Sequence, residues 1–406
     1  MLVQQSALYF NKRGLICMKT NKKWLSIIMC AVFLLIVTLS TGFAYIRNDS
    51  ADSIKLLAES SIEGNIVNFA PFEYKNITVR LFPETLISKD EAIKKYINAY
   101  EYITKRVAEF NIKVDIDDAE FQEAVKPFFL IELDDKVLEK EIKEFAIFMD
   151  FYENKHNNDA IIEAISQKSI NEKEIYNLMP ASTQSTQAYD GMVSNKPVVT
   201  LSELSEHTEN ITTSSYNSST AAKYATTWWN KTNNTDYPYY ADYYHQSKTN
   251  NDINDLPAGA SGQSNPRRGW NDCTNFVSQA IYKGGISTIK SGLILPHTSN
   301  DNWYYSDSKP SYTWGGADNF YKHFSNRAGM ALSSSDLQVG DVVSVDFTGD
   351  GTIDHTIIIT KTTGTTTNQQ FVTYHTIDSN QTRNLKYFYD YNENVKLYGY
   401  EMDKVN

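Results

Sequence analysis

The sequence predicts an α+β fold in which a helix carrying a single thiol precedes an antiparallel sheet. The helix is indicated by the run from Asn271 to Ala280, where apolar residues fall at helical spacing from Cys273. The sheet is indicated by short apolar stretches in the last third of the chain, which turn residues separate. The expected strands are 341–347, 355–361, 371–376, 385–391 and 395–402.

The composition limits the class of protein. The chain has 406 residues, of which 41% are hydrophobic and 13% aromatic, so it can bury a core and its length favours two folded units. Its net charge is -11 and its isoelectric point is near 5.2, which argues against a nucleic-acid partner held through phosphates. The cysteines are Cys17, Cys30 and Cys273, so neither a disulfide framework nor a paired-cysteine metal site is expected in the folded part. We expect no cofactor.

Residues 1–46 predict a signal peptide or a signal-anchor. Basic residues precede an apolar run from Trp24 to about Leu39, which is the layout of an export signal. Small residues around Ala44 permit cleavage, and the run continued to Ile46 is also long enough to span a bilayer. Because the positive charges precede the run, we expect the rest of the chain outside the cytoplasm, secreted or anchored to the membrane.

Residues 50–179 predict a mostly helical α+β domain without a recognisable role. An amphipathic helix is expected over 89–110, and Ser88 and Glu91 form a capping box at its start. Further helices are expected over 137–151 and 159–165, and strands over 77–82 and 127–133.

Residues 180–215 are rich in Ser, Thr and Gln and predict a linker. The final domain then covers 216–406. It is expected to open with a helix over 220–229, and Gly284 and Gly285 are expected to end the helix that carries Cys273.

Cys273 is the candidate nucleophile. A thiol in the first turn of a helix meets the positive end of the helix dipole, which lowers its pKa and favours the thiolate. The alternative is a buried small hydrophobe, as most free cysteines are. Asp272 precedes it and is a residue type that caps helices.

His355 is the candidate base, because it heads an expected strand beside a loop; a hydrogen-bonded strand histidine is the alternative. Two residues that pair across the turn near residue 365 are expected to have residue numbers that add up to about 730. This places His375 opposite His355 on the same face of the sheet. His375 could then orient His355 as the third member of a triad, and Asp378 competes for that role. A register slip of one residue would remove the pairing.

These motifs resemble the bacterial "putative amidase domain" family, which is related to NlpC-like and CHAP-type peptidases and amidases of papain-like fold. The similarity rests on Asn271–Gln279, Gly340–Val342 and Asp354–Thr356, and it covers roughly residues 216–400. It implies a papain-like cysteine hydrolase of amide bonds, with Cys273 as nucleophile and His355 as base. With export, it implies peptidoglycan peptides as the substrate.

Two further expectations concern ligands. Asp272, Trp303 and Trp314 are expected to contact substrate, the tryptophans as walls of an aromatic cleft. Asp346, Thr348, Asp350 and Asp354 resemble the start of a calcium-binding loop, although Ile357 stands where that loop needs a glutamate, and a tight turn explains the glycines more simply.

The alternative function is a cell-envelope binding module that keeps the papain-like fold without catalysis. The presence of Cys273, His355 and His375 together disfavours it, because a binding module needs none of them.

Overall fold

A computed structural model describes residues 60–74, 77–108, 112–166, 172–181, 215–240, 271–292 and 295–405. Among these residues, Ser60–Ile161 and 172–405 form one compact unit. The predicted signal segment and most of the predicted linker lie outside the described residues. Within the described ranges, no helix is both long enough and apolar enough to cross a membrane.

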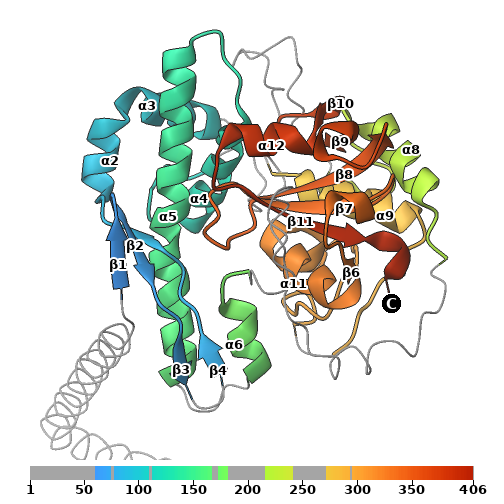
Figure 1. The fold of residues 1–406 in the computed structure, drawn as a ribbon, viewed down its shortest axis with the longest axis horizontal. Helices are drawn as coiled ribbons and strands as arrows, with labels where there is room; N and C mark the ends of the chain where they lie inside the picture. Colours follow the sequence, from blue (N-terminus) through green and yellow to red (C-terminus); the bar gives the residue numbers. More distant parts are fainter. Residues whose placement is uncertain are drawn as a thin grey trace, which may run out of the picture. The chain divides into compact units, whose positions relative to one another are not determined.

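The N-terminal part combines short strands with helices (Figure 1). A three-stranded sheet has the order β1-β2-β5, and β3 and β4 form a hairpin. The strands are β1 (Ser60–Glu63), β2 (Ile66–Phe69), β3 (Phe72–Tyr74), β4 (Ile77–Val79) and β5 (Glu84–Thr85). The helices are α2 (Lys89–Lys95), α3 (Ile97–Ala108), α4 (Ala119–Val125), the 3-10 helix η1 (Lys126–Leu130), α5 (Lys136–Ser166) and α6 (Glu172–Leu178).

The capping box at Ser88 is confirmed, because the backbone N–H of each residue donates to the side chain of the other. Three element predictions differ from the structure. The helix expected over 89–110 is broken at Tyr96 into α2 and α3. The two helices expected within 137–165 are one continuous helix, α5. The strand expected over 127–133 is mainly the 3-10 helix η1, since Pro127 opens a fully buried apolar run whose periodicity alone cannot distinguish strand from helix.

The C-terminal part is built on a six-stranded antiparallel sheet of order β10-β9-β8-β7-β11-β6 (Figure 1). Its strands are β6 (Gly329–Met330), β7 (Val342–Asp346), β8 (His355–Thr362), β9 (Gln370–Tyr374), β10 (Ser379–Asn384) and β11 (Lys396–Glu401). Its α-helices are α8 (Ser218–Trp228), α9 (Cys273–Lys283), α10 (Tyr312–Gly315), α11 (Ala317–Arg327) and α12 (Leu385–Tyr391). This arrangement confirms an antiparallel α+β class.

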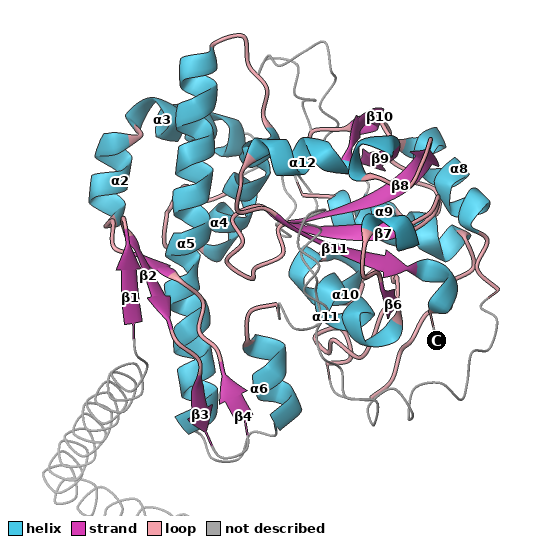
Figure 2. Cartoon of the chain, in the orientation of Figure 1, coloured by secondary structure: helices cyan, strands magenta, loops and turns pink. Residues whose placement is uncertain are grey.

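The strand predicted over 385–391 is wrong: these residues form α12 (Figure 2). The Asn384 side chain accepts a hydrogen bond from the backbone N–H of Tyr387 and caps the helix start. Leu385 and Phe388 are both buried, and their separation of three positions is the spacing of one helix face. The cap and this spacing outweigh the β-propensity of the tyrosines around them.

The two faces of the large sheet pack against different parts of the chain. Val342 and Ile358 point to the core that contains α9 and α8. Val343 and Ile357, one position along, point to the core that contains α4 and α5. On this second face Phe129 of η1 stacks on Phe347 with ring centroids 4.5 Å apart. The N-terminal helices therefore cover one face of the six-stranded sheet.

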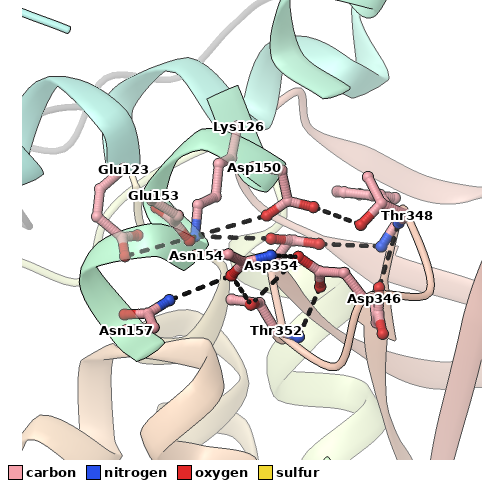
Figure 3. Close-up of polar contacts among 12 residues, drawn as sticks. Glu123, Lys126, Asp150, Glu153, Asn154, Asn157, Asp346, Thr348, Thr352 and Asp354 are labelled. Atoms are coloured by element: carbon pink, nitrogen blue, oxygen red, sulfur yellow. Dashed lines mark hydrogen bonds and ion pairs between the residues drawn. The ribbon is translucent and has the colours of Figure 1, made fainter. Parts of the chain in front are cut away.

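Polar contacts join the same two parts at the loop between β7 and β8 (Figure 3). Thr348 donates to Asp150 of α5 at 2.6 Å, and Asn154 of α5 donates to Asp350 at 2.5 Å. Gly351 has a φ of 97°, and a Cβ there would lie 2.4 Å from Pro180. Glycine is therefore required where residues 180–181 cross the loop.

Lys126 is the buried cation of this junction. Its ammonium pairs with Glu153 and lies 3.7 Å from a carboxylate oxygen of Glu123, 3.7 Å from one of Asp354 and 4.0 Å from one of Asp150 (Figure 3). Although burial opposes the charge, these carboxylates raise the pKa of Lys126 well above its usual value. Several carboxyl groups thus share one lysine as their positively charged neighbour.

We predict that Lys126→Met destabilises the protein by about 3–5 kcal/mol, because it leaves buried carboxylates without a counter-charge. Unfolding in urea, with the slope unchanged, measures this loss. Lys89→Met removes an exposed pair with Asp117 and should change stability little. Equal effects of the two variants would contradict the role of Lys126.

Candidate active site

Cys273 is the first residue of α9 and lines a cavity of about 420 Å³. Its thiol is 7% exposed and lies 3.6 Å from the Thr274 hydroxyl, which in turn hydrogen-bonds Thr356 of β8 at 2.8 Å. Among the described cysteines, Cys273 is free. A larger cavity of about 1030 Å³ beside α6 and α11 contains none of the predicted site residues.

The thiol is not activated in this structure. Burial, with a smaller effect from the negative charge of Asp272, raises the pKa of Cys273 to about 11, although hydrogen bonds from Thr274 and from the Thr356 backbone oppose the shift. The prediction that the helix start lowers this pKa is therefore wrong for the resting structure, since desolvation exceeds the helix dipole.

His375 and Asp272 form a buried pair next to this cysteine. His375 Nδ1 lies 2.7 Å from Asp272 Oδ2, and its Nε2 lies 2.8 Å from the carbonyl oxygen of Trp228. Both partners only accept, so both ring nitrogens donate and the contacts favour the imidazolium. The ring stacks on Phe276 of α9 at 3.9 Å between centroids.

A chain of hydrogen bonds continues from this pair into the core. Asp272 Oδ1 accepts from the Asn275 amide at 2.6 Å, and Asn275 Oδ1 accepts from Trp314 Nε1 at 2.8 Å. Trp303 Nε1 donates to Ser278 at 3.1 Å. These bonds explain why the motif from Asp272 to Ser278 alternates polar with apolar residues. They also place Asp272 as a partner of His375 and Asn275 rather than as a side-chain cap.

Trp303 and Trp314 do not line a cleft in this structure. Both are 0% exposed, and their rings stack at 4.8 Å between centroids. Each indole N–H donates a hydrogen bond to a side chain of α9, so the two tryptophans help to hold that helix in place. The two tryptophans, which were expected to form the wall of a cleft, are part of the hydrophobic core.

The predicted register between β8 and β9 is wrong by one residue. Ile358 pairs with Thr373 and Ile359 with Val372. Because faces alternate along a strand, the slip puts His375 on the α9 face and His355 on the opposite face. The two imidazoles are therefore separated by the sheet.

His355 is enclosed by aromatic rings on the face that packs against the N-terminal helices. It lies edge to face with Tyr374 at 4.9 Å and stacks on Phe347 at 5.9 Å. Its Nε2 has no hydrogen-bond partner among the described residues. Burial, with the nearby positive charge of Arg383, lowers the pKa of His355 to about 3, so it is neutral at physiological pH.

Asp378 is buried just before β10, after a turn in which Thr376 and Ile377 have φ values of 65° and 61°. Positive φ is costly for residues with a branched side chain, so this turn is held by its surroundings. One restraint is the hydrogen bond from the backbone N–H of Asp272 to the Thr376 hydroxyl at 3.0 Å.

The loop proposed for calcium is satisfied internally. The Asp346 carboxylate accepts from the backbone N–H groups of Thr348, Gly349 and Gly351 at 3.2, 2.5 and 2.9 Å. In the ranges that the structure describes, no three acidic, histidine or cysteine side chains are arranged to hold a metal ion. The positive charge beside Asp354 is Lys126.

The sequence reasoning missed the N-terminal residues that reach this site. They are Glu123, Lys126, Asp150, Glu153 and Asn154. One signal was present: Asp150, Glu153, Asn154 and Asn157 recur at helical spacing and form a polar stripe on α5.

Comparison with known proteins agrees with the resemblance seen in the motifs. Residues 215–400 match the family described as "Putative amidase domain", which suggests amide-bond hydrolysis. The uncharacterized protein YhbB of Bacillus subtilis (strain 168) is 34% identical over 115 residues, or 27% of this chain and 34% of that protein. The match thus spans about a third of that relative. No solved structure matches, and the relation to NlpC-like and CHAP-type enzymes stays a prediction.

We predict that His355→Phe makes the folding stability of the protein less sensitive to acid. Since the imidazole titrates near pH 6.5 when unfolded and near 3 when folded, the wild type loses stability as pH falls below about 6.5, by about 2.7 kcal/mol at pH 4.5. Urea unfolding at pH 7.5 and 4.5 should show a smaller loss of stability in the variant, because the contribution of His355 is absent. An identical pH dependence in both proteins would contradict a neutral buried His355.

We also predict slow alkylation of Cys273 at neutral pH. With a pKa near 11, the rate with iodoacetamide should keep rising between pH 8 and 10. A rate that levels off below pH 8 would show that the thiolate already forms in the resting protein.

Proposed function

We propose that the chain is an exported cysteine hydrolase that cleaves amide bonds, with Cys273 as its nucleophile. The observation that carries the proposal is the position of Cys273, which opens a helix, lines a cavity and follows an aspartate bonded to a buried histidine. The family match over residues 215–400 supports the reaction class. A papain-like relationship is part of the proposal.

His375 is the better base for Cys273, with Asp272 as the residue that orients it. It lies on the α9 face of the sheet, whereas His355 lies on the opposite face and a strand residue cannot change face without a register slip. During catalysis, His375 Nδ1 keeps its hydrogen bond to Asp272. The bond between Nε2 and the Trp228 carbonyl oxygen breaks, and Nε2 turns toward the Cys273 thiol.

The reaction then follows the usual course for a thiol nucleophile. Once Nε2 has left the Trp228 carbonyl it gives its proton to water. The neutral His375 then accepts the Cys273 proton as Sγ attacks the amide carbon, and the N-terminal N–H groups of α9 stabilise the oxyanion. Collapse of the tetrahedral intermediate breaks the C–N bond, and His375 gives its proton to the leaving amine. Water hydrolyses the thioester with His375 again as base, which releases the acid and restores the thiol.

Cell-wall peptides are the proposed substrate. The basic and apolar N-terminal segment supports export, since it has the order of a signal or signal-anchor. An amide hydrolase outside the cytoplasm meets peptidoglycan stem peptides as its most abundant fixed amide substrate. This assignment depends on location rather than on a pocket residue.

A non-catalytic envelope-binding module is the second candidate, and one observation favours it. The pKa of Cys273 is raised to about 11, and the two His375 nitrogens are directed at Asp272 and at the Trp228 carbonyl. Such a protein would bind stem peptides without releasing amine.

We predict that Cys273→Ala and His375→Ala each lower amide hydrolysis by about 10³-fold or more, because nucleophile and base act as a unit. Release of new amino groups from stem peptides by the full-length chain measures the rate. The activity of His355→Phe should stay within about tenfold of the wild-type activity, because His355 lies on the face of the sheet opposite to α9.

Activity that survives Cys273→Ala would move the chemistry elsewhere. Loss of activity in His355→Phe, with activity kept in His375→Ala, would reverse the assignment of the base. A wild-type chain that binds stem peptides and releases no amine would establish the binding module.

A further inference from the structure

The Asp272 carboxylate is held at both of its oxygens. Oδ2 lies 2.7 Å from His375 Nδ1, and Oδ1 accepts a hydrogen bond from the Asn275 side-chain amide at 2.6 Å. The backbone N–H of Asp272 also donates to the Thr376 hydroxyl at 3.0 Å. Asp272, Asn275 and His375 are all buried, so little water competes for these bonds. The carboxylate therefore has one orientation relative to the histidine ring.

Trp314 determines which way round the Asn275 amide lies. An indole Nε1 can only donate, and here it lies 2.8 Å from the Asn275 side-chain oxygen. The amide oxygen must face Trp314, which leaves the amide N–H groups to face Asp272. With the amide reversed, the indole N–H would meet an N–H group and Asp272 Oδ1 would meet an oxygen, which leaves buried polar groups unpaired. Through Asn275, Trp314 thus ensures that Asp272 receives a donor.

Trp314 is itself fixed by the rings around it. It lies in the short helix α10, is 0% exposed and stacks on Trp303 at 4.8 Å between centroids. Tyr282 of α9 packs edge to face against the same ring at 5.8 Å. A ring enclosed in this way cannot change rotamer without displacing its neighbours, so Nε1 stays directed at Asn275. The chain of bonds from Trp314 to His375 therefore starts from a rigid end.

The proposed reaction requires Asp272 to stay in place while the histidine ring moves. Nδ1 keeps its bond to Asp272 as Nε2 leaves the Trp228 carbonyl and turns toward the thiol. A carboxylate that could rotate would lose Nδ1 or move with it, and Nε2 would then be misplaced relative to the sulfur. A misplacement of about 1 Å can cost on the order of 100-fold in rate.

We propose that Asn275 and Trp314 are positioning residues of the hydrolase, which hold the Asp272 carboxylate in the orientation that His375 needs. Neither residue is among those that line the cavity at Cys273. Each acts through the next, since Trp314 orients Asn275 and Asn275 orients Asp272. This inference rests on the proposed function, because it takes His375 as the base for Cys273.

Trp303 provides a matched control for Trp314. It is also 0% exposed, it stacks on the same pair of rings, and its indole N–H donates to an α9 side chain, that of Ser278, at 3.1 Å. Among the described residues, no hydrogen bond continues from Ser278 to Asp272. Trp314→Phe and Trp303→Phe therefore remove the same kind of donor and the same volume, but only Trp314→Phe breaks the chain to His375.

The first measurement is the release of amino groups from stem peptides by the full-length chain. Trp314→Phe should lower kcat by about 10- to 100-fold and leave KM within about threefold, because the base is misplaced in the chemical step. Trp303→Phe should lose less than about threefold in kcat. Because Asn275 and Trp314 act in one chain, Asn275→Ala/Trp314→Phe should be no slower than Asn275→Ala alone.

Urea unfolding of each variant checks that folded chains are compared. If Trp314→Phe does not fold, Asn275→Ala and Ser278→Ala make the same comparison, since each removes the α9 partner of one tryptophan. Equal losses of kcat within either pair would overturn the inference. Losses that multiply in Asn275→Ala/Trp314→Phe would overturn it as well.

A second measurement needs no turnover and separates this inference from the proposed function. In the Cys273→Ala chain with isotope-labelled histidine, NMR observes the Nδ1 proton of His375, which is assigned by its absence in His375→Gln. Its exchange with water should be faster by about tenfold or more when Trp314→Phe is added, and unchanged when Trp303→Phe is added.

That difference in exchange, in a protein whose wild type releases no amine, would support the positioning of Asp272 and contradict the hydrolase. The same exchange rate with either tryptophan substitution would overturn the positioning, even if the wild type cleaves stem peptides.

Discussion

The buried pair of Asp272 and His375 is the interaction on which the site depends. It joins the start of α9, the turn after β9 and, through the Trp228 carbonyl, the end of α8. Charged groups in an interior this dry are stable only when every polar atom has a partner, and here the second Asp272 oxygen is bonded to Asn275. Any displacement of these elements would leave a buried charge uncompensated, so the position of Cys273 is tightly determined.

A second constraint sets what the site can accept. The N-terminal helices cover one face of the sheet and hold the β7–β8 loop through Lys126, Asp150 and Asn154. Because that loop leads directly into β8, its docking also positions Asp354 at the cavity. The same helices that pack on the sheet therefore also line the cavity at Cys273.

Cys273 and His375 have different surroundings. Burial raises the pKa of Cys273, whereas both ring nitrogens of His375 lie within hydrogen-bond distance of oxygen acceptors. In the proposed hydrolase, a substrate that draws the His375 ring from the Trp228 carbonyl toward the thiol would activate the nucleophile only when it is bound.

The sequence by itself determined the features that follow from local periodicity and capping. These include the helix that starts at Cys273, the box at Ser88 and four of the five strands expected in the C-terminal sheet, together with the α+β class. Only the tertiary structure decided which histidine shares a face with Cys273, because a register shift of one residue reverses every side chain of a strand. It also decided that Trp303 and Trp314 lie in the core, and that α4 and α5 reach the cavity. Such contacts join residues of different elements, up to more than a hundred positions apart, and no local pattern in the chain encodes them.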